Sequence, residues 1–383
     1  MESRSLRIVT VMNCNRGIAG GMPVHSAMLS RELRRLGHHV ENLFLDDVPG
    51  WVARKGLNYT LFAPLIARQI RQIEERSAPF DVIQFSGGDG FLAPLVRRDR
   101  LGRRRLVVAR SHGLEHLYWR AFQQEVAGGY EHCSLAHRLY FGGLRLWEVE
   151  KAIRAADLFI CHTYREMDYV TRRGWKSRAQ IGVTPSGVPP DWMHVPLDPL
   201  PRNRILWSGS WQWPKGKRLL VDVFSALAAV SDVRLTVVGT VAERDVVLAA
   251  FPPEVRARVD VIADVPHAQM PELFKTHSML LATSVYEGFG AIVAEAMAAG
   301  LPVVASRAGG WPQYVRSADT GVMVDTWDPD AFVAGSLWLL KLSDDDLLSI
   351  RTRAREAISE LSWLGQAVDL ARQFNLSLKR LVQ

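Results

Sequence analysis

Residues 286–306 read Y-E-G-F-G-A-I-V-A-E-A-M-A-A-G-L-P-V-V-A-S, and they give the clearest indication of the fold. A short apolar run at 279–282 leads into this stretch, and a second run at 303–305 closes it. Runs of this kind, bounded by Gly and Pro, are typical of strands buried on both faces. Between the runs, Gly288 and Gly290 predict a tight turn, and the apolar residues that follow predict a helix that ends at Gly300. Backbone N–H groups at the start of that helix are suited to bind hydroxyls or an anion.

Two acidic residues mark this predicted helix. Glu287 stands just before it, and Glu295 lies inside it among residues that are otherwise almost wholly apolar. Alone, the pair also fits an N-terminal capping acid and a solvated helix residue. A helix this apolar is expected to be buried, however, and a buried carboxylate needs a partner. We therefore expect the two carboxylates to hold two parts of one extended polar ligand.

The same alternation of short apolar runs and amphipathic segments continues outward in both directions. Nine runs predict strands: Ile8–Met12, Val82–Phe85, Leu106–Ala109, Leu158–Cys161, Ile205–Trp207, Leu235–Val238, Val259–Ile262, Met279–Ala282 and Val303–Ala305. One of the predicted helices spans His25–Leu36 and ends at Gly37. Alternating strands and helices predict an α/β fold with parallel sheets.

A stretch with three prolines, His194–Asn203, predicts a stiff linker between two domains. We expect one domain at 1–195 and a second at 203–364. A length of 383 residues is typical of two domains.

Composition narrows the class of protein. Hydrophobic residues make up 48% and charged residues 23%, as in ordinary globular proteins, and no run approaches the roughly 18–20 apolar residues of a membrane-spanning helix. The three cysteines form no C-x-x-C pair, which favours a reducing cytosol over a disulfide or zinc framework. The net charge of +7 divides into +9 for residues 1–195 and −2 for 196–383, so the first half favours an anionic partner.

The segment E-G-F-G-x-x-x-x-E-A-M-A-x-G-x-P-V-V-A-S resembles the signature of glycosyltransferase family 4, the retaining enzymes of the GT-B fold. Shorter elements occur in the family's order: Gly20-Gly21 before a helix, Ser111-His112-Gly113, Ala155-Ala156-Asp157, T-P-S-G-V at 184–188, the segment 206–220, and Ser362-Trp363 before a closing helix. The resemblance implies two Rossmann-like domains that face each other across a central cleft. It also implies that the closing helix, 365–383, completes the first domain.

The resemblance also implies roles for individual residues. Glu287 matches the glutamate that contacts donor-sugar hydroxyls, Glu295 matches the one that contacts the ribose, and Lys215 has the spacing of the diphosphate lysine. His112 corresponds to a histidine near the reacting sugar. The implied catalytic set is Glu287, His112 and Lys215, and the implied donor-binding set is Gly21, Ser210, Lys215, Asp264, Val265, Glu287, Gly288, Phe289, Gly290 and Glu295. The sequence departs from the family at Ser210, where an arginine is usual, and Lys217, Arg218 or Ser210 itself is expected to contact the phosphate instead. Phe289 equally fits a packing role.

The implied reaction is metal-independent transfer of a hexose from UDP- or GDP-hexose, with retention. Asp328-Pro329-Asp330 has the form of a metal-binding Asp-x-Asp motif, but its position predicts a helix cap. We therefore expect no cofactor and no metal. Lys215, main-chain N–H groups and helix dipoles are then expected to meet the charge of the leaving group.

The acceptor is expected to be a glycolipid or a lipopolysaccharide or polysaccharide precursor. Two basic segments suggest peripheral association of this cytoplasmic protein with the inner face of a membrane. They are the arginines Arg97, Arg98, Arg100, Arg103, Arg104 and Arg105, and the segment Trp51–Arg76, which mixes apolar and basic residues. An ordinary helix with a solvated basic face fits the second segment as well.

Three other functions fit parts of the pattern. A sugar-nucleotide epimerase or a glycogen-synthase-like polymerase would use the same architecture. A nicotinamide-dependent oxidoreductase is disfavoured because no G-x-G-x-x-G opens either half. A basic nucleic-acid-binding protein is disfavoured because there is no zinc pattern and the arginines lack interleaved aromatic residues.

Overall fold

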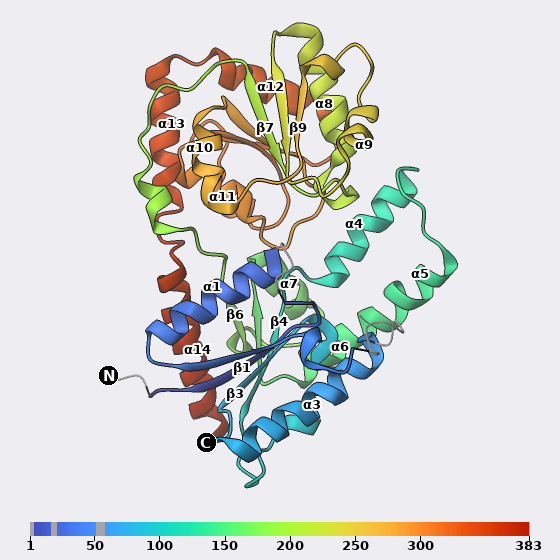
Figure 1. The fold of residues 1–383 in the computed structure, drawn as a ribbon, viewed down its shortest axis with the longest axis vertical. Helices are drawn as coiled ribbons and strands as arrows, with labels where there is room; N and C mark the ends of the chain where they lie inside the picture. Colours follow the sequence, from blue (N-terminus) through green and yellow to red (C-terminus); the bar gives the residue numbers. More distant parts are fainter. Residues whose placement is uncertain (1–3, 17–20, 51–57, 383) are drawn as a thin grey trace. The chain divides into compact units, whose positions relative to one another are not determined.

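The computed structural model describes residues 4–16, 21–50 and 58–382, and these residues form two compact units (Figure 1). The first unit comprises Met1–Gly187 and Trp363–Gln383, and the second comprises Val188–Ser362. The chain therefore passes between the units at 187–188 and again at 362–363. The Pro-rich stretch 194–203, where the sequence placed the boundary, lies wholly within the second unit.

The first unit is built on a six-stranded parallel sheet in the order β2-β1-β3-β4-β5-β6. Its strands are β1 (Arg7–Val11), β2 (His39–Leu43), β3 (Val82–Ser86), β4 (Leu106–Arg110), β5 (Leu158–Cys161) and β6 (Ile181–Val183). Its helices are α1 (Gly21–Arg35), α3 (Asn58–Arg76), α4 (Glu115–Ala127), α5 (Leu135–Leu139), α6 (Leu146–Ala155), α7 (Tyr164–Arg172) and α14 (Trp363–Val382). The closing helix α14 thus belongs to the same unit as the N-terminal strand.

Helices cover both faces of this sheet. A strand such as β1 packs against helices on both sides, because successive side chains of a strand point to opposite faces. Ile8 and Val82 pack with Leu33 of α1 and Phe374 of α14 in one cluster. The next residue of each strand faces the other way, where α3 supplies the packing partners Phe62, Ile66 and Ile70. The apolar side of α3 is therefore part of the core.

The second unit repeats the plan with the strand order β12-β11-β10-β7-β8-β9, again all parallel. Its strands are β7 (Arg204–Ser208), β8 (Arg234–Val238), β9 (Val259–Ile262), β10 (Met279–Ala282), β11 (Val303–Ser306) and β12 (Val322–Val324). Its helices are α8 (Lys217–Val230), α9 (Arg244–Ala249), α10 (Met270–Lys275), α11 (Ala291–Ala298), α12 (Pro329–Lys341) and α13 (Asp344–Ala357).

Helix α11 is buried on one face of this second sheet, as its apolar sequence predicted. Val293 and Met297 of α11 pack with Leu206 and Leu280 of the sheet. Phe224 of α8 and Phe332 of α12 cover the opposite face.

All nine predicted strands are present, and the two Rossmann-like halves confirm the predicted α/β fold. The sequence did not predict β2, β6 and β12. Each of them lies at the edge of its sheet, where one side lacks a strand partner and the residues are less uniformly apolar. Helix α1 begins at Gly21, four residues before the predicted start. Among the described residues, no helix is both long and apolar enough to span a membrane.

Candidate functional site

A lysine–glutamate pair lies at the carboxyl end of the second sheet. The Nζ atom of Lys215 is 2.7 Å from Oε1 of Glu287, and the hydroxyl of Ser284 donates to the same oxygen at 2.8 Å. Glu287 follows β10, and Lys215 follows β7 in the short 3₁₀ helix Trp213–Lys215. The side chain of Glu287 is 10% exposed and that of Lys215 is 29% exposed, so a ligand can reach both.

Backbone and hydroxyl contacts hold the lysine segment against the glutamate segment. The N–H groups of Val285 and Tyr286 donate to the carbonyl of Pro214 at 2.8 and 3.1 Å. The Thr283 hydroxyl donates to the carbonyl of Lys215 at 3.1 Å. Gly216 has a φ of +67°, and a Cβ there would lie 1.9 Å from the carbonyl oxygen of Thr283. Only glycine permits this close approach, so the pair is fixed by the fold before any ligand binds.

The tight turn before α11 opens the helix N-terminus toward the same region. Gly290 is the N-cap of α11, with a φ of +81° and no side-chain capping bond. The indole N–H of Trp311 donates to the Gly290 carbonyl at 2.7 Å, and a Cβ on Gly290 would lie 2.2 Å from that nitrogen. The positive end of the helix dipole therefore remains beside Glu287 and Lys215 for an anionic or hydroxyl-bearing ligand.

Phe289 and Gly288 contribute in different ways. The side chain of Phe289 is buried in the core, and its ring centroid lies 6.2 Å from that of Tyr314. Its carbonyl accepts the N–H of Gly310 at 2.9 Å. Phe289 thus has the packing role that was the alternative in the sequence, and Gly288 is partly exposed at the turn.

Glu295 has a partner that the sequence did not predict. Its Oε1 lies 2.9 Å from Nε2 of His267, and the glutamate side chain is 13% exposed against 45% for the histidine. The hydrogen bond and charge of Glu295 raise the pKa of His267, against a smaller opposing effect of burial. The ring centroids of Trp192 and His267 are 4.8 Å apart. Glu295 is therefore neither a solvated residue nor a buried charge without a partner.

Among the described residues, no hydrogen bond or ion pair joins the other predicted donor-side residues of the second unit to the side chains of Lys215 and Glu287. Ser210 is half-buried after β7, and its carbonyl accepts the N–H of Gln212 at 2.7 Å. Asp264 is exposed, and Val265 packs against the α11 cluster. In the described part of the chain, no side-chain hydrogen bond is recorded for Ser210 or Asp264.

In the first unit, His112 lies just beyond the carboxyl end of β4. Its Nε2 is 3.2 Å from the Ser86 hydroxyl, while its Nδ1 is buried and has no hydrogen-bond partner among the described residues. Burial, with smaller contributions from His162 and Arg110, lowers the pKa of His112 well below its ordinary value. His112 is therefore a neutral imidazole at neutral pH, with its Nδ1 buried and without a partner among the described residues.

A buried cation next to His112 was missed by the sequence reasoning. Arg110 is 1% exposed, its Nη2 lies 2.6 Å from Nε2 of His25, and His25 in turn lies 3.1 Å from the Ser186 hydroxyl. Burial lowers the pKa of Arg110 to about 10. The available signal was an arginine that ends the otherwise apolar run L-V-V-A-R. The rings of His25, His112 and His162 lie 4.6 to 5.8 Å apart.

Two further sequence predictions concern a glycine pair and an aspartate pair. Gly21 begins α1, and no atom of the described residues lies within 4 Å of where its Cβ would be; Gly20 lies outside the described residues. Asp328 caps α12 by accepting the N–H of Ala331 at 3.0 Å, which confirms the predicted helix cap. Among the described residues, no group of three or more His, Cys, Asp or Glu side chains is placed to hold a metal ion.

Family models match both halves of the chain. The model described as Glycosyltransferase Family 4 matches residues 19–192, and the model described as Glycosyl transferases group 1 matches residues 202–342. Together the two ranges cover most of the sequence.

Curated proteins of similar sequence are also named as glycosyltransferases. The chain is 28% identical over 251 residues to a D-inositol 3-phosphate glycosyltransferase of Xylanimonas cellulosilytica, a match that covers 60% of each chain. It is 25% identical over 405 residues to the enzyme of that name from Segniliparus rotundus, covering 95% of this chain and 86% of the relative.

Solved structures share the fold. Sucrose-phosphate synthase from Thermosynechococcus elongatus superposes with a TM-score of 0.74 at 18% identity, covering 98% of this chain and 100% of the other. HepE from Anabaena in complex with UDP and glucose has a TM-score of 0.65 at 17% identity, covering 97% and 99%. These likenesses and the two six-stranded parallel sheets confirm the predicted GT-B fold. With both halves matched by the family models, the chain belongs to glycosyltransferase family 4.

Proposed function

We propose that this protein transfers a hexose from UDP- or GDP-hexose to a hydroxyl group of an acceptor, with retention of configuration. The observation that carries the proposal is the Lys215–Glu287 pair, held by the fold beside the N-terminus of α11, which has no side-chain cap among the described residues. A carboxylate suits sugar hydroxyls, while an ammonium and a helix N-terminus suit a diphosphate, so one donor can engage both.

In this proposal the donor lies along the segment from Glu287 to Glu295. Glu287 accepts hydrogen bonds from the sugar, and the N–H groups of Gly288, Phe289 and Gly290 approach the sugar and diphosphate. Glu295 accepts from the ribose hydroxyls, with His267 holding its carboxylate in place at 2.9 Å. Main-chain groups near Asp264 and Val265 receive the base.

The reaction is proposed to proceed by front-face attack. The bond between the anomeric carbon and the leaving phosphate oxygen breaks, and the acceptor oxygen bonds to that carbon on the same face. The acceptor proton passes to the leaving phosphate oxygen, so no protein nucleophile is consumed. Lys215 stabilises the negative charge that grows on the diphosphate, and no metal ion is needed for that charge. Neutral His112 is proposed to accept or donate a hydrogen bond at the reacting hydroxyl.

The acceptor is proposed to be a glycan or glycolipid, such as a lipopolysaccharide or polysaccharide precursor. The protein is proposed to act in the cytoplasm, associated with an anionic membrane surface through the basic first unit. Phe62 and Ile66 of α3 are buried in the core, so the arginines rather than an apolar face of α3 would make that contact. Residues 51–57 of the same segment lie outside the described residues.

A ligand screen tests the donor site first. Melting of the purified protein is measured with UDP, GDP, ADP, TDP and CMP, and the best ligand is repeated with Glu295→Ala. A ligand at 100 times its Kd adds about 2.7 kcal/mol to the stability of the folded state. We expect UDP or GDP to stabilise the wild type and not the variant. No stabilisation by any of the five would contradict the donor-site assignment.

Analysis of the reaction products then distinguishes retaining transfer from epimerisation and from inverting transfer. The stabilising nucleotide's sugar conjugates are incubated with and without candidate acceptors, and the anomeric configuration of the product is read by NMR. Conversion of the donor to an epimer without any acceptor would favour an epimerase, and an inverted product would contradict the front-face mechanism.

A further inference from the structure

A cationic cavity lies in the first unit at the amino-terminal edge of its sheet. Arg104, Asp157 and Gln180 line it, and they lie within two residues before the starts of β4, β5 and β6. The cavity has a volume of about 390 Å³. Reaction sites of parallel α/β sheets lie outside the carboxyl ends of the strands, where His112 is found. This cavity is therefore separate from the candidate site of transfer.

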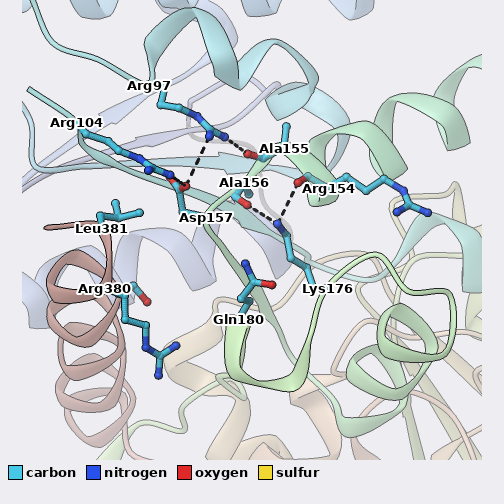
Figure 2. Close-up of a pocket in the computed structure, with 11 residues that line it drawn as sticks. Arg97, Arg104, Arg154, Ala155, Ala156, Asp157, Lys176, Gln180, Arg380 and Leu381 are labelled. Atoms are coloured by element: carbon cyan, nitrogen blue, oxygen red, sulfur yellow. Dashed lines mark hydrogen bonds and ion pairs between the residues drawn. The ribbon is translucent and has the colours of Figure 1, made fainter. Parts of the chain in front are cut away.

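Five basic side chains line this cavity against one carboxylate. The basic residues are Arg97, Arg104, Arg154, Lys176 and Arg380, and the acid is Asp157. Figure 2 shows Arg97 and Arg104 directed at Asp157, with Arg380 and Leu381 of α14 on one side and Lys176 and Gln180 on the other. Residues from distant parts of the chain thus bring positive charge to one cavity.

The carboxylate does not balance this charge. Oδ1 of Asp157 accepts from Arg104 at 3.0 Å and lies 3.9 Å from Arg97, while Oδ2 accepts the N–H of Val107 at 3.0 Å. One negative charge is thereby shared by two guanidinium groups and a backbone amide. The Nε of Arg97 is buried and has no hydrogen-bond partner among the described residues. The Nη2 of Arg97 donates to the carbonyl of Ala155, a neutral group that does not reduce the positive charge.

The other cations face neutral groups for the most part. Lys176 donates to the carbonyls of Arg154 and Ala156, at the carboxyl end of α6, and Arg380 donates to the carbonyl of Ala179. The Lys176 contacts place a positive charge at the negative end of the α6 dipole, which is favourable. Neither these contacts nor that of Arg380 reduces the net positive charge of the cavity lining. Arg154 is the exception, because its Nε pairs with Glu150 at 2.7 Å. The lining of the cavity therefore keeps a net positive charge, which favours an anionic ligand.

We propose that this cavity binds the phosphate group of an anionic ligand. Guanidinium groups match a phosphate through paired N–H donors, and several cations around one anion are typical of phosphate recognition. The volume is within the range of small-ligand sites. The proposal does not depend on the transferase reaction, because none of these residues belongs to the donor site.

A neighbouring groove bears on the source of the phosphate. It has a volume of about 1100 Å³, shares Arg104 and Leu381 with the cavity, and is lined by the apolar side chains of Leu36, Phe80 and Leu376. Such a groove would accommodate a hydrocarbon chain attached to the bound phosphate. The phosphate can thus be part of a lipid or of a soluble molecule, and the test includes both.

Binding to the full-length protein is measured by isothermal titration calorimetry, with inorganic phosphate and, separately, with dihexanoyl phosphatidic acid below its micellar concentration. All titrations use a Lys215→Met background, which removes the proposed diphosphate contact of the donor site. Arg104→Ala and Arg380→Ala are each expected to weaken binding at least about tenfold, or 1.4 kcal/mol. Arg31→Ala, which removes one charge from α1 outside the cavity, is expected to leave binding unchanged.

Comparison of inorganic phosphate with phosphatidic acid shows whether the bound phosphate belongs to a lipid or to a soluble molecule. Tighter binding of phosphatidic acid than of phosphate, with no binding of dihexanoyl phosphatidylcholine, would assign a lipid phosphate. Equal binding of the two phosphate probes would assign a soluble ligand, and both results support the cavity. No binding of either probe, or the same affinity in the Arg104 and Arg380 variants with unchanged melting temperatures, would overturn the proposal. Transferase activity is assayed separately on Arg104→Ala and Arg380→Ala in the wild-type background, with Lys215 intact. It is expected to be unchanged in both variants, so failure of phosphate binding leaves the proposed reaction intact.

Discussion

Replacing Lys215 by methionine tests the centre of the proposed mechanism. Methionine keeps the length and packing of the side chain but removes the ammonium that lies 2.7 Å from Glu287. Glu287 keeps the hydroxyl of Ser284 at 2.8 Å, so the carboxylate is not left without a partner. The fold should therefore survive, and the loss should appear in the reaction.

The magnitude follows from the charge that Lys215 is proposed to meet. Two unit charges about 4 Å apart attract by about 4 kcal/mol at an effective dielectric constant of about 20. Because Glu287 neutralises part of the lysine, we expect about 3 kcal/mol, similar to the loss of one oxyanion donor. At about 1.4 kcal/mol per tenfold, the substitution should lower the transfer rate by roughly two orders of magnitude.

The assay is steady-state transfer with the donor identified by the ligand screen. We expect kcat and kcat/KM to fall together, because an interaction made mainly in the transition state affects both. Lys275→Met is the matched control, since Lys275 lies in the same unit and pairs only with Glu272 among the described residues. A fall of less than about threefold, or a rise in KM with unchanged kcat, would refute the assigned role.

Three further predictions concern the turn, a titrating group and metal. Gly290→Ala should lower the free energy of unfolding, measured in urea, by about 2 kcal/mol or more, because position 290 has a positive φ and the new Cβ would clash with Trp311. The control Gly21→Ala should change the free energy of unfolding little. His267 has a raised pKa, so its contribution to stability is fully present below its unfolded pKa and is lost as pH rises through the folded pKa. The urea midpoint of the wild type should therefore fall more between pH 6 and pH 8 than that of His267→Gln. This pH range is chosen from the ordinary His pKa of about 6.5. Parallel plots of urea midpoint against pH for the two proteins would contradict the prediction. Transfer should continue at the same rate in EDTA, and a loss that Mg²⁺ or Mn²⁺ restores would contradict the role proposed for Lys215.

Some of the site was predictable because its signal is local. The E-G-F-G turn, the helix that follows and the flanking strands are contiguous, so residue pattern alone places Glu287 at a helix N-terminus. The cap at Asp328 was predictable for the same reason. The domain boundary was misplaced by several residues, because proline content marks a stiff segment and does not show which unit the segment packs against.

Other features arise only from contacts between distant residues. Glu295 was expected to need a partner, but nothing in the pattern identified His267, which lies on a separate 3₁₀ segment. The cluster of His25, Arg110 and His162 likewise joins α1 to the ends of β4 and β5. Helix α14 brings Arg380 to the phosphate cavity from the far end of the sequence.

The α/β class, nine of the strands and the residues most suited to hold a sugar nucleotide were all predictable from the residue pattern. They were predictable because burial on both faces of a parallel strand and the steric freedom of glycine are properties of a few adjacent residues. Which charged side chains pair with one another depends on how the strands are ordered in the folded protein. Lys215 reaches Glu287 because β7 and β10 are neighbours in the sheet, although they are far apart in the chain. Strand order sets such distances, and a linear pattern of residues does not contain it.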